Sequence, residues 1–174
     1  LIVVLNKYLQ YYKISKETCM QKLLIAVEGV SNSGKTTTLK EILSLLQKDP
    51  KTISIRIQNE VKKKKQNEFY IPKIGDMTCI FELALINNKL LKIGIATGGD
   101  TLDIVSSNLT YFDNNNCDVM FCATKSRGQT VDYIHNYIDN KETIFLPIFK
   151  ACDTNKHDTK LAQDIVNTAL KWFS

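Results

Sequence analysis

The sequence predicts an α/β fold, in which a mostly parallel β-sheet lies between two layers of helices as a three-layer α/β/α domain. Two observations carry this prediction. Short apolar segments of strand length alternate with longer segments whose apolar residues recur at helical spacing, as in parallel strands joined by helices. The alternation is interrupted once, between residues 77 and 97, where two apolar runs follow one another across a short turn. We expect one domain over residues 22–174.

The individual elements follow from these patterns. Strands are expected over residues 23–27, 52–58, 77–85, 90–97, 118–123 and 143–149, and helices over residues 35–46, 101–115, 130–139 and 161–173. The third and fourth strands form an antiparallel hairpin, because Asn87 and Asn88 suit a tight turn, so one strand runs against the others. The strand over 52–58 alternates apolar and polar residues and is expected nearer an edge. The four lysines at 62–65 are interpreted as a solvated polar loop.

Residues 29–36 match the pattern G-x-x-x-x-G-K-[ST] at every fixed position. They read Gly29-Val30-Ser31-Asn32-Ser33-Gly34-Lys35-Thr36. The expected strand before them and the expected helix after them give the context that such a loop requires. Gly29 and Gly34 permit backbone angles that a side chain would forbid. Because a helix N-terminus carries a partial positive charge, the N–H groups of this segment favour a bound anion. The sequence therefore predicts a phosphate-binding loop.

This motif and its flanking strand and helix resemble those of the P-loop NTPases. The resemblance implies that Lys35 reaches the β- and γ-phosphates of ATP and that the Thr36 hydroxyl ligates Mg²⁺. It also implies that the nucleotide is bound by Gly29, Val30, Ser31, Asn32, Ser33, Gly34, Lys35, Thr36 and Thr37. The pairs Glu28-Gly29 and Thr36-Thr37 are similar to the start of thymidylate kinase-type nucleotide kinases. Adenine is the expected base, because residues 124–127 lack the Asn-Lys-x-Asp pattern of GTPases.

A carboxylate that serves the magnesium ion is expected beyond the carboxyl end of a strand. Asp100 is the first candidate, as a ligand of the metal or as the group that activates a water. Alternatively, Asp100 caps the helix that follows it. Asp76 is the second candidate, because an antiparallel hairpin brings Gly75-Asp76 and Gly99-Asp100 to the same edge of the sheet. Glu28, which adjoins the loop, is the third.

Arginine is scarce, since Arg56 and Arg127 are the two arginines among 23 basic residues. Nucleotide kinases usually clamp phosphates with several guanidinium groups, so this scarcity counts against an ordinary nucleotide kinase. Arg127 resembles the lid arginine of small kinases, or an arginine supplied to the γ-phosphate; the alternative is a solvated loop residue. Lys125, Arg127 and the lysine run would form the acceptor site of a small-molecule or nucleotide kinase. The base is expected near residues 150–153.

Composition narrows the classes of partner. The net charge of +5 is the sole support for nucleic-acid binding, which is not expected. The five cysteines show no metal-binding spacing, which indicates reduced thiols and a cytoplasmic protein. No apolar run approaches the roughly 18 residues of a membrane span. Residues 1–21 carry a helical apolar stripe and are expected to form an appended helix that packs on the domain or on a protein partner.

Together these features predict Mg²⁺-dependent binding of ATP, with hydrolysis or phosphoryl transfer to a small-molecule or nucleotide acceptor. Lys35, Asp100 and Arg127 are the expected catalytic residues. The expected metal ligands are Thr36, Asp100 and Asp76. The alternative from another class is a nucleotide-dependent switch whose slow hydrolysis accompanies binding to a protein partner.

Overall fold

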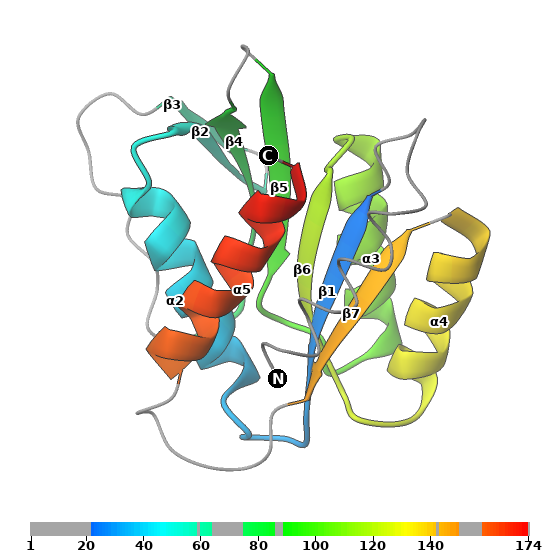
Figure 1. The fold of residues 1–174 in the computed structure, drawn as a ribbon. Coiled ribbons are helices and arrows are strands. Elements are labelled where there is room, and N and C mark those ends of the chain that lie inside the picture. The colour runs from blue at the N-terminus through cyan, green and yellow to red at the C-terminus, as the bar shows by residue number, and fades with distance from the viewer. Residues whose placement is uncertain are drawn as a thin grey trace.

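A computed structural model of the chain describes residues 22–58, 60–63, 75–85, 89–141, 143–149 and 158–173 (Figure 1). These residues form an α/β structure. Its strands are β1 (Leu23–Glu28), β2 (Thr52–Ile57), β3 (Glu60–Lys63), β4 (Thr78–Ala84), β5 (Leu90–Ala96), β6 (Val119–Thr124) and β7 (Ile144–Phe149). Its helices are α2 (Lys35–Lys48), α3 (Leu102–Asn114), α4 (Gln129–Lys141) and α5 (Asp158–Phe173). Each strand and helix predicted over residues 22–174 is present, with ends that differ by a few residues. The expected helix over residues 1–21, the turn at 87–88 and the base site at 150–153 lie outside the described residues.

Within the described residues the strands form one seven-stranded sheet in the order β3-β2-β4-β5-β6-β1-β7. Pairing is parallel between β5 and β6, β6 and β1, and β1 and β7. The predicted hairpin is confirmed, because β4 pairs antiparallel with β5 and places Cys79 opposite Ile95. β6 lies between β1 and β5, so the loop after β1 and the segment after β5 leave the sheet from strands that are not neighbours.

The prediction of one antiparallel strand is wrong, because β3 also runs against the parallel strands. Its residues include Lys62 and Lys63, which the sequence pattern assigned to a polar loop. β3 pairs with β2 through the backbone and places Val61 opposite Arg56. Backbone pairing does not require alternating apolar and polar residues, so the sequence pattern contains no sign of this strand. Lysines on an edge strand oppose further pairing with other chains, which suits this position. β2 is second from the edge, as its alternation suggests, and a register shift near its start leaves Ile53 exposed.

Helices cover both faces of the sheet, which confirms the three-layer arrangement. Side chains of a strand alternate between faces, so Ile25 and Val27 of β1 join the apolar cluster that includes residues of α2 and α5. Leu24 and Ala26 join the opposite cluster, with residues of α3 and α4. All six residues of β1 are buried. This burial fixes the strand from which the loop of residues 29–36 emerges.

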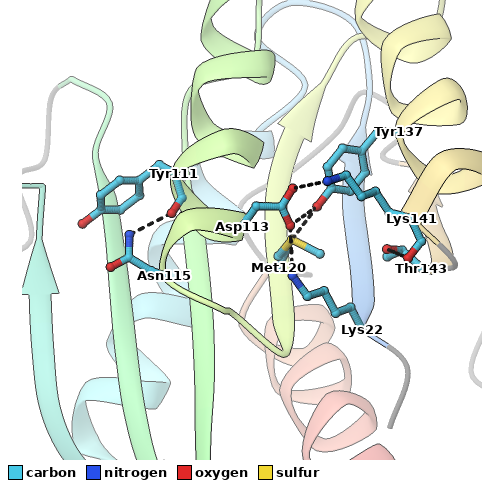
Figure 2. A network of polar contacts seen from close by, with 8 residues as sticks. All are labelled: Lys22, Tyr111, Asp113, Asn115, Met120, Tyr137, Lys141 and Thr143. Carbon is cyan, nitrogen blue, oxygen red and sulfur yellow. Dashed lines mark hydrogen bonds and ion pairs between the residues drawn. The ribbon is translucent and has the colours of Figure 1, made fainter. Parts of the chain in front are cut away.

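At the amino ends of the parallel strands, a polar network joins α3, α4 and the residue before β1 (Figure 2). The Asp113 carboxylate accepts hydrogen bonds from Lys22 Nζ at 3.0 Å and from the Tyr137 hydroxyl at 2.8 Å. Lys141 Nζ lies 3.6 Å from the same carboxylate. Burial raises the pKa of Asp113, but the hydrogen bonds from Lys22 and Tyr137 and the charges of Lys22 and Lys141 outweigh burial and lower it. The network stabilises the end of the sheet away from the candidate site.

None of the helices in the described part of the chain is long and apolar enough to cross a membrane.

Candidate functional site

The loop of residues 29–36 follows β1 directly and turns into α2. Two of its residues are in the left-handed region, Asn32 with φ 60° and Gly34 with φ 87°. Gly34 is the N-cap residue of α2, and it makes no side-chain cap. The loop is anchored to the neighbouring strand, because the Gly29 N–H donates to the Thr124 carbonyl at 3.2 Å. The first turn of α2 is therefore presented at the carboxyl edge of the sheet.

Lys35, the first residue of α2, points back into the loop. Its Nζ donates to the carbonyl oxygens of Gly29 at 3.1 Å and Val30 at 2.9 Å. The side chain is 7% exposed, and its Nζ lies 3.8 Å from Asp100 Oδ1. A buried ammonium group requires hydrogen bonds and an opposing charge, and this arrangement supplies both. The loop is thus wrapped around one buried positive charge.

The described residues enclose a cavity of about 320 Å³ in front of this loop. Its wall contains the second half of the loop, the start of α2, and the segments that flank the hairpin. The lining residues are Asn32, Ser33, Gly34, Lys35, Thr36, Thr37, Asp76, Thr97, Gly98, Gly99, Asp100 and Ala123. Asp76 and Asp100 therefore face one cavity, as the hairpin geometry predicts. The volume is at the lower end of the roughly 300–1,000 Å³ of small-molecule sites.

Thr97 connects the loop side of the cavity to the hairpin side. The Thr36 hydroxyl donates to the Thr97 carbonyl at 3.3 Å. The Thr97 hydroxyl accepts from the Met77 N–H at 2.8 Å and donates to Asp76 Oδ1 at 3.4 Å. A hydroxyl, a carbonyl and a carboxylate are thereby gathered at one place. Such oxygen ligands suit Mg²⁺, so Thr36 and Asp76 fit a magnesium site.

Asp100 reaches Lys35 because Gly98 and Gly99 carry the chain across the end of β6. A Cβ built on Gly99 would overlap the carbonyl oxygen of Ala123, the residue of β6 beneath it. A Cβ on Gly98 would lie 2.8 Å from Asp76 Oδ2. Gly99 accepts no side chain in this path, and a side chain at Gly98 would require Asp76 to shift. Asp100 lies three residues beyond Thr97 because the chain must cross the end of β6 before it reaches the loop that follows β1. Gly98 and Gly99 make that crossing.

The capping alternative for Asp100 is wrong. Thr101 is the N-cap residue of α3, and its side chain accepts a hydrogen bond from the Ile104 N–H at 3.4 Å. The Asp100 side chain is 66% exposed and lies toward Lys35 instead. Its position at the cavity is therefore left without a capping explanation.

The other predicted residues lie around this centre. Glu28 is 4% exposed, and burial raises its pKa, while the charge of His135 opposes that shift. Glu28 does not line the cavity, nor do Lys125 and Arg127, which are exposed on the loop between β6 and α4. Val30 of the loop is also exposed and does not line the cavity. The structure thus brings together the loop, Asp76 and Asp100, and it leaves Arg127 outside the cavity wall.

Two polar residues, one lining the cavity and one behind its wall, were not predicted as site residues from the sequence. Thr97 ends a strand, which is a signal that could have identified it. Asn108 occupies a buried position of α3 between Val105 and Leu109, where the helical pattern calls for an apolar residue. Asn108 Nδ2 donates to the Gly98 carbonyl at 3.2 Å. A polar residue on an apolar helix face was the available signal.

Ser33, which lines the cavity, has a buried hydroxyl group without a hydrogen-bond partner among the described residues. A buried polar atom without a partner is costly, and a bound phosphate oxygen would satisfy it. No group of three or more His, Cys, Asp or Glu residues is placed to hold a metal in the described part of the chain. A cation here would therefore draw on hydroxyl and carbonyl oxygens as well as carboxylates.

Comparison of the chain with models of protein families, with curated proteins and with solved structures finds no match in any of the three.

Proposed function

We propose that the chain binds ATP with Mg²⁺ at this cavity and either hydrolyses it or transfers its terminal phosphoryl group to a small acceptor. The observation that carries the proposal is the loop of residues 29–36, folded around the buried Lys35 ammonium at the start of α2. A motif match alone establishes the spacing of residue types along the sequence and says nothing of a binding cavity. Here residues 32–36 of that motif border a cavity that the Asp76 and Asp100 carboxylates also line, whereas residues 29–31 do not line it.

The N-terminus of α2 and the Lys35 charge supply the attraction for phosphate. The first N–H groups of a helix lack intrahelical acceptors, and the helix dipole favours an anion there. The Ser33 hydroxyl adds an unsatisfied buried donor. Lys35 holds its ammonium group beside the cavity, where it opposes the negative charge that builds up on a transferring phosphoryl group.

Thr36 and Asp76 would hold Mg²⁺ on this proposal, with Asp100 as the second carboxylate facing the same space. When bound, Mg²⁺ neutralises charge on the phosphate oxygens. Asp100 is placed to orient a water or an acceptor hydroxyl, because it lies next to Lys35 and is largely exposed. Lys125 and Arg127 lie exposed on the loop between β6 and α4, outside the cavity wall, and they are assigned no role in this proposal.

A nucleotide-dependent switch is the second candidate, and the Lys35–Asp100 ion pair favours it. Asp100 directly precedes Thr101, the cap of α3. A triphosphate that engages Lys35 competes with Asp100, so ligand binding is coupled to the start of a helix. Binding of a protein partner in the presence of ATP alone would identify a switch, and acceleration of ATP consumption by a phosphate acceptor would identify a kinase.

The proposal is tested by thermal unfolding with and without ATP and Mg²⁺. Ligand at 100 times its dissociation constant stabilises the folded state by about 2.7 kcal/mol. Lys35→Met keeps most of the side-chain volume and removes the charge, and it should abolish that gain. Lys48→Met, at the exposed far end of α2, is the matched control and should keep it. Equal stabilisation of Lys35→Met and the parent chain would reject the proposed site.

A further inference from the structure

Asn108 lies outside the cavity wall yet contacts the segment that carries Asp100. It is 8% exposed and stands on the face of α3 that packs on the sheet, next to Val105 and Leu109. Burying an amide in such a layer costs free energy unless its donors and acceptor are bonded. An apolar residue would serve helix packing better. The amide therefore calls for a reason other than packing.

Its two contacts supply that reason. Asn108 Nδ2 donates to the Gly98 carbonyl at 3.2 Å, and Asn108 Oδ1 accepts from the Thr78 hydroxyl at 2.9 Å. Thr78 begins β4, two residues after Asp76, and Gly98 stands two residues before Asp100. One side chain thus connects both chain segments that deliver a carboxylate to the cavity.

The segment that Asn108 contacts contains two buried glycines in succession, Gly98 and Gly99. The ladder between β4 and β5 ends with the Thr97 N–H bonded to the Met77 carbonyl at 3.0 Å. Gly98 and Gly99 follow, and glycine has the largest conformational freedom of any residue. Neither glycine has a side chain that could pack. An added Cβ would meet Asp76 at Gly98 and the Ala123 carbonyl at Gly99. The path to Asp100 therefore depends on backbone contacts such as the one from Asn108.

We infer that Asn108 is a positioning residue of the ATP site, which holds the Gly98–Gly99 segment so that Asp100 stays beside Lys35. Asn108 acts through Asp100 and does not itself touch the ligand. The inference rests on the proposed function for its catalytic consequence, but the positioning of Gly98 and Gly99 is a property of the nucleotide-free protein.

The kinetic test is a double-mutant cycle between Asn108 and Asp100. Asn108→Ala should lower the rate of phosphate release from ATP about tenfold, with a smaller effect on the ATP concentration at half-maximal rate. In an Asp100→Ser background the same change should lower the rate less than about twofold, because the carboxylate that it positions is gone. Val105→Ala, a buried truncation on the same helix face, is the control for general destabilisation and should leave the rate unchanged.

A second measurement needs no nucleotide. Backbone ¹⁵N order parameters of Gly98 and Gly99 should fall from the rigid value of about 0.85 toward 0.6 in Asn108→Ala and stay unchanged in Val105→Ala. If Asn108→Ala does not fold, Thr78→Val removes the bond that orients the amide, and it should show the same changes at smaller size. Unchanged order parameters, or an equal rate loss in the Asp100→Ser background, would overturn the inference. A parent chain that does not bind ATP would reject the proposed function while the order parameters still decide the role of Asn108.

Discussion

Lys35 and Asp100 form an ion pair at the cavity, with 3.8 Å between Nζ and Oδ1. The two side chains differ sharply in exposure, at 7% for Lys35 and 66% for Asp100. Lys35 is also held by two loop carbonyls. Asp100 is therefore the partner with room to move when a ligand arrives.

Asp100→Ser should change the melting temperature of the nucleotide-free protein little, because Asp100 is largely exposed and Lys35 Nζ keeps its hydrogen bonds to the Gly29 and Val30 carbonyls. The rate of phosphate release from ATP should fall at least about tenfold, which is about 1.4 kcal/mol of barrier. Asp103→Ser removes the same charge from the exposed side of α3 and should keep the parent rate. Full activity in Asp100→Ser would remove this carboxylate from the mechanism.

Asp76→Ser should act on the metal requirement. The variant removes a carboxylate that the Thr97 hydroxyl contacts and that shares the cavity with Thr36. We expect the Mg²⁺ concentration at half-maximal rate to rise about tenfold or more, as is typical when a group around a metal is lost. A titration of phosphate release against Mg²⁺ measures this. An unchanged midpoint in Asp76→Ser together with a raised one in Asp100→Ser would exchange the two assignments.

Gly99→Ala should destabilise the fold and displace Asp100 from Lys35. The added methyl group meets the Ala123 carbonyl, which is backbone and cannot rotate away. Gly128→Ala is the comparison, because Gly128 has φ 91° and no atom within 4 Å of a built Cβ. It should cost about 1–2 kcal/mol for the left-handed angle alone. Urea unfolding should show a larger loss for Gly99→Ala; an equal or smaller one would mean that the segment relaxes freely.

Gly94→Ala tests the packing of α3 on β5. A Cβ at Gly94 would overlap the Phe112 ring, so either the ring or the helix must shift. Overpacking of this kind costs about 1–3 kcal/mol. Combining Gly94→Ala with Phe112→Leu should cost less than the sum of the two single changes in urea unfolding. Strict additivity would show that the two residues do not compete for the same space.

The Asp113 network should make stability depend on acid pH. The folded pKa of Asp113 is lowered, so its contribution is complete above the unfolded pKa of about 3.9 and is lost as pH falls below it toward the folded pKa. Asp113→Asn should reduce stability at neutral pH and flatten the loss below about pH 5. Urea unfolding across this range measures both effects. Asp139→Asn, an exposed change on α4, should keep the parent slope; the same slope in Asp113→Asn would contradict the assignment.

Much of the candidate site could be predicted because its signals are local. The loop of residues 29–36 is one continuous motif, and the hairpin alone brings Asp76 and Asp100 to one edge. The pairing of Asp100 with Lys35 could not be predicted, because it depends on β6 lying between β1 and β5. Strand order is set by long-range packing, which apolar periodicity does not encode. The role of Gly99 as the residue that passes over Ala123 has the same origin.

The fold was predictable to the same limit. Buried strands such as β1 and β6 can be recognised in the sequence as continuous apolar runs. β3 has no such run, because it belongs to the sheet through backbone pairing with β2 at the edge. Asn108 was not predicted as a site residue, because the apolar residues Val105 and Leu109 beside it are enough to predict the helix.

The position of β1 in the sheet has a consequence for folding of the chain during its synthesis on the ribosome. Both neighbours of β1, which are β6 and β7, emerge long after it, whereas β2, β4 and β5 pair among themselves. A nascent chain that ends within α3 has the complete motif of residues 29–36 and neither of the strands that flank β1 in the sheet. Pairing between such distant segments forms slowly, because a long loop must close first. The loop of residues 29–36 is thus translated early and the cavity in front of it is assembled late, so an unfinished chain carries the motif without the cavity.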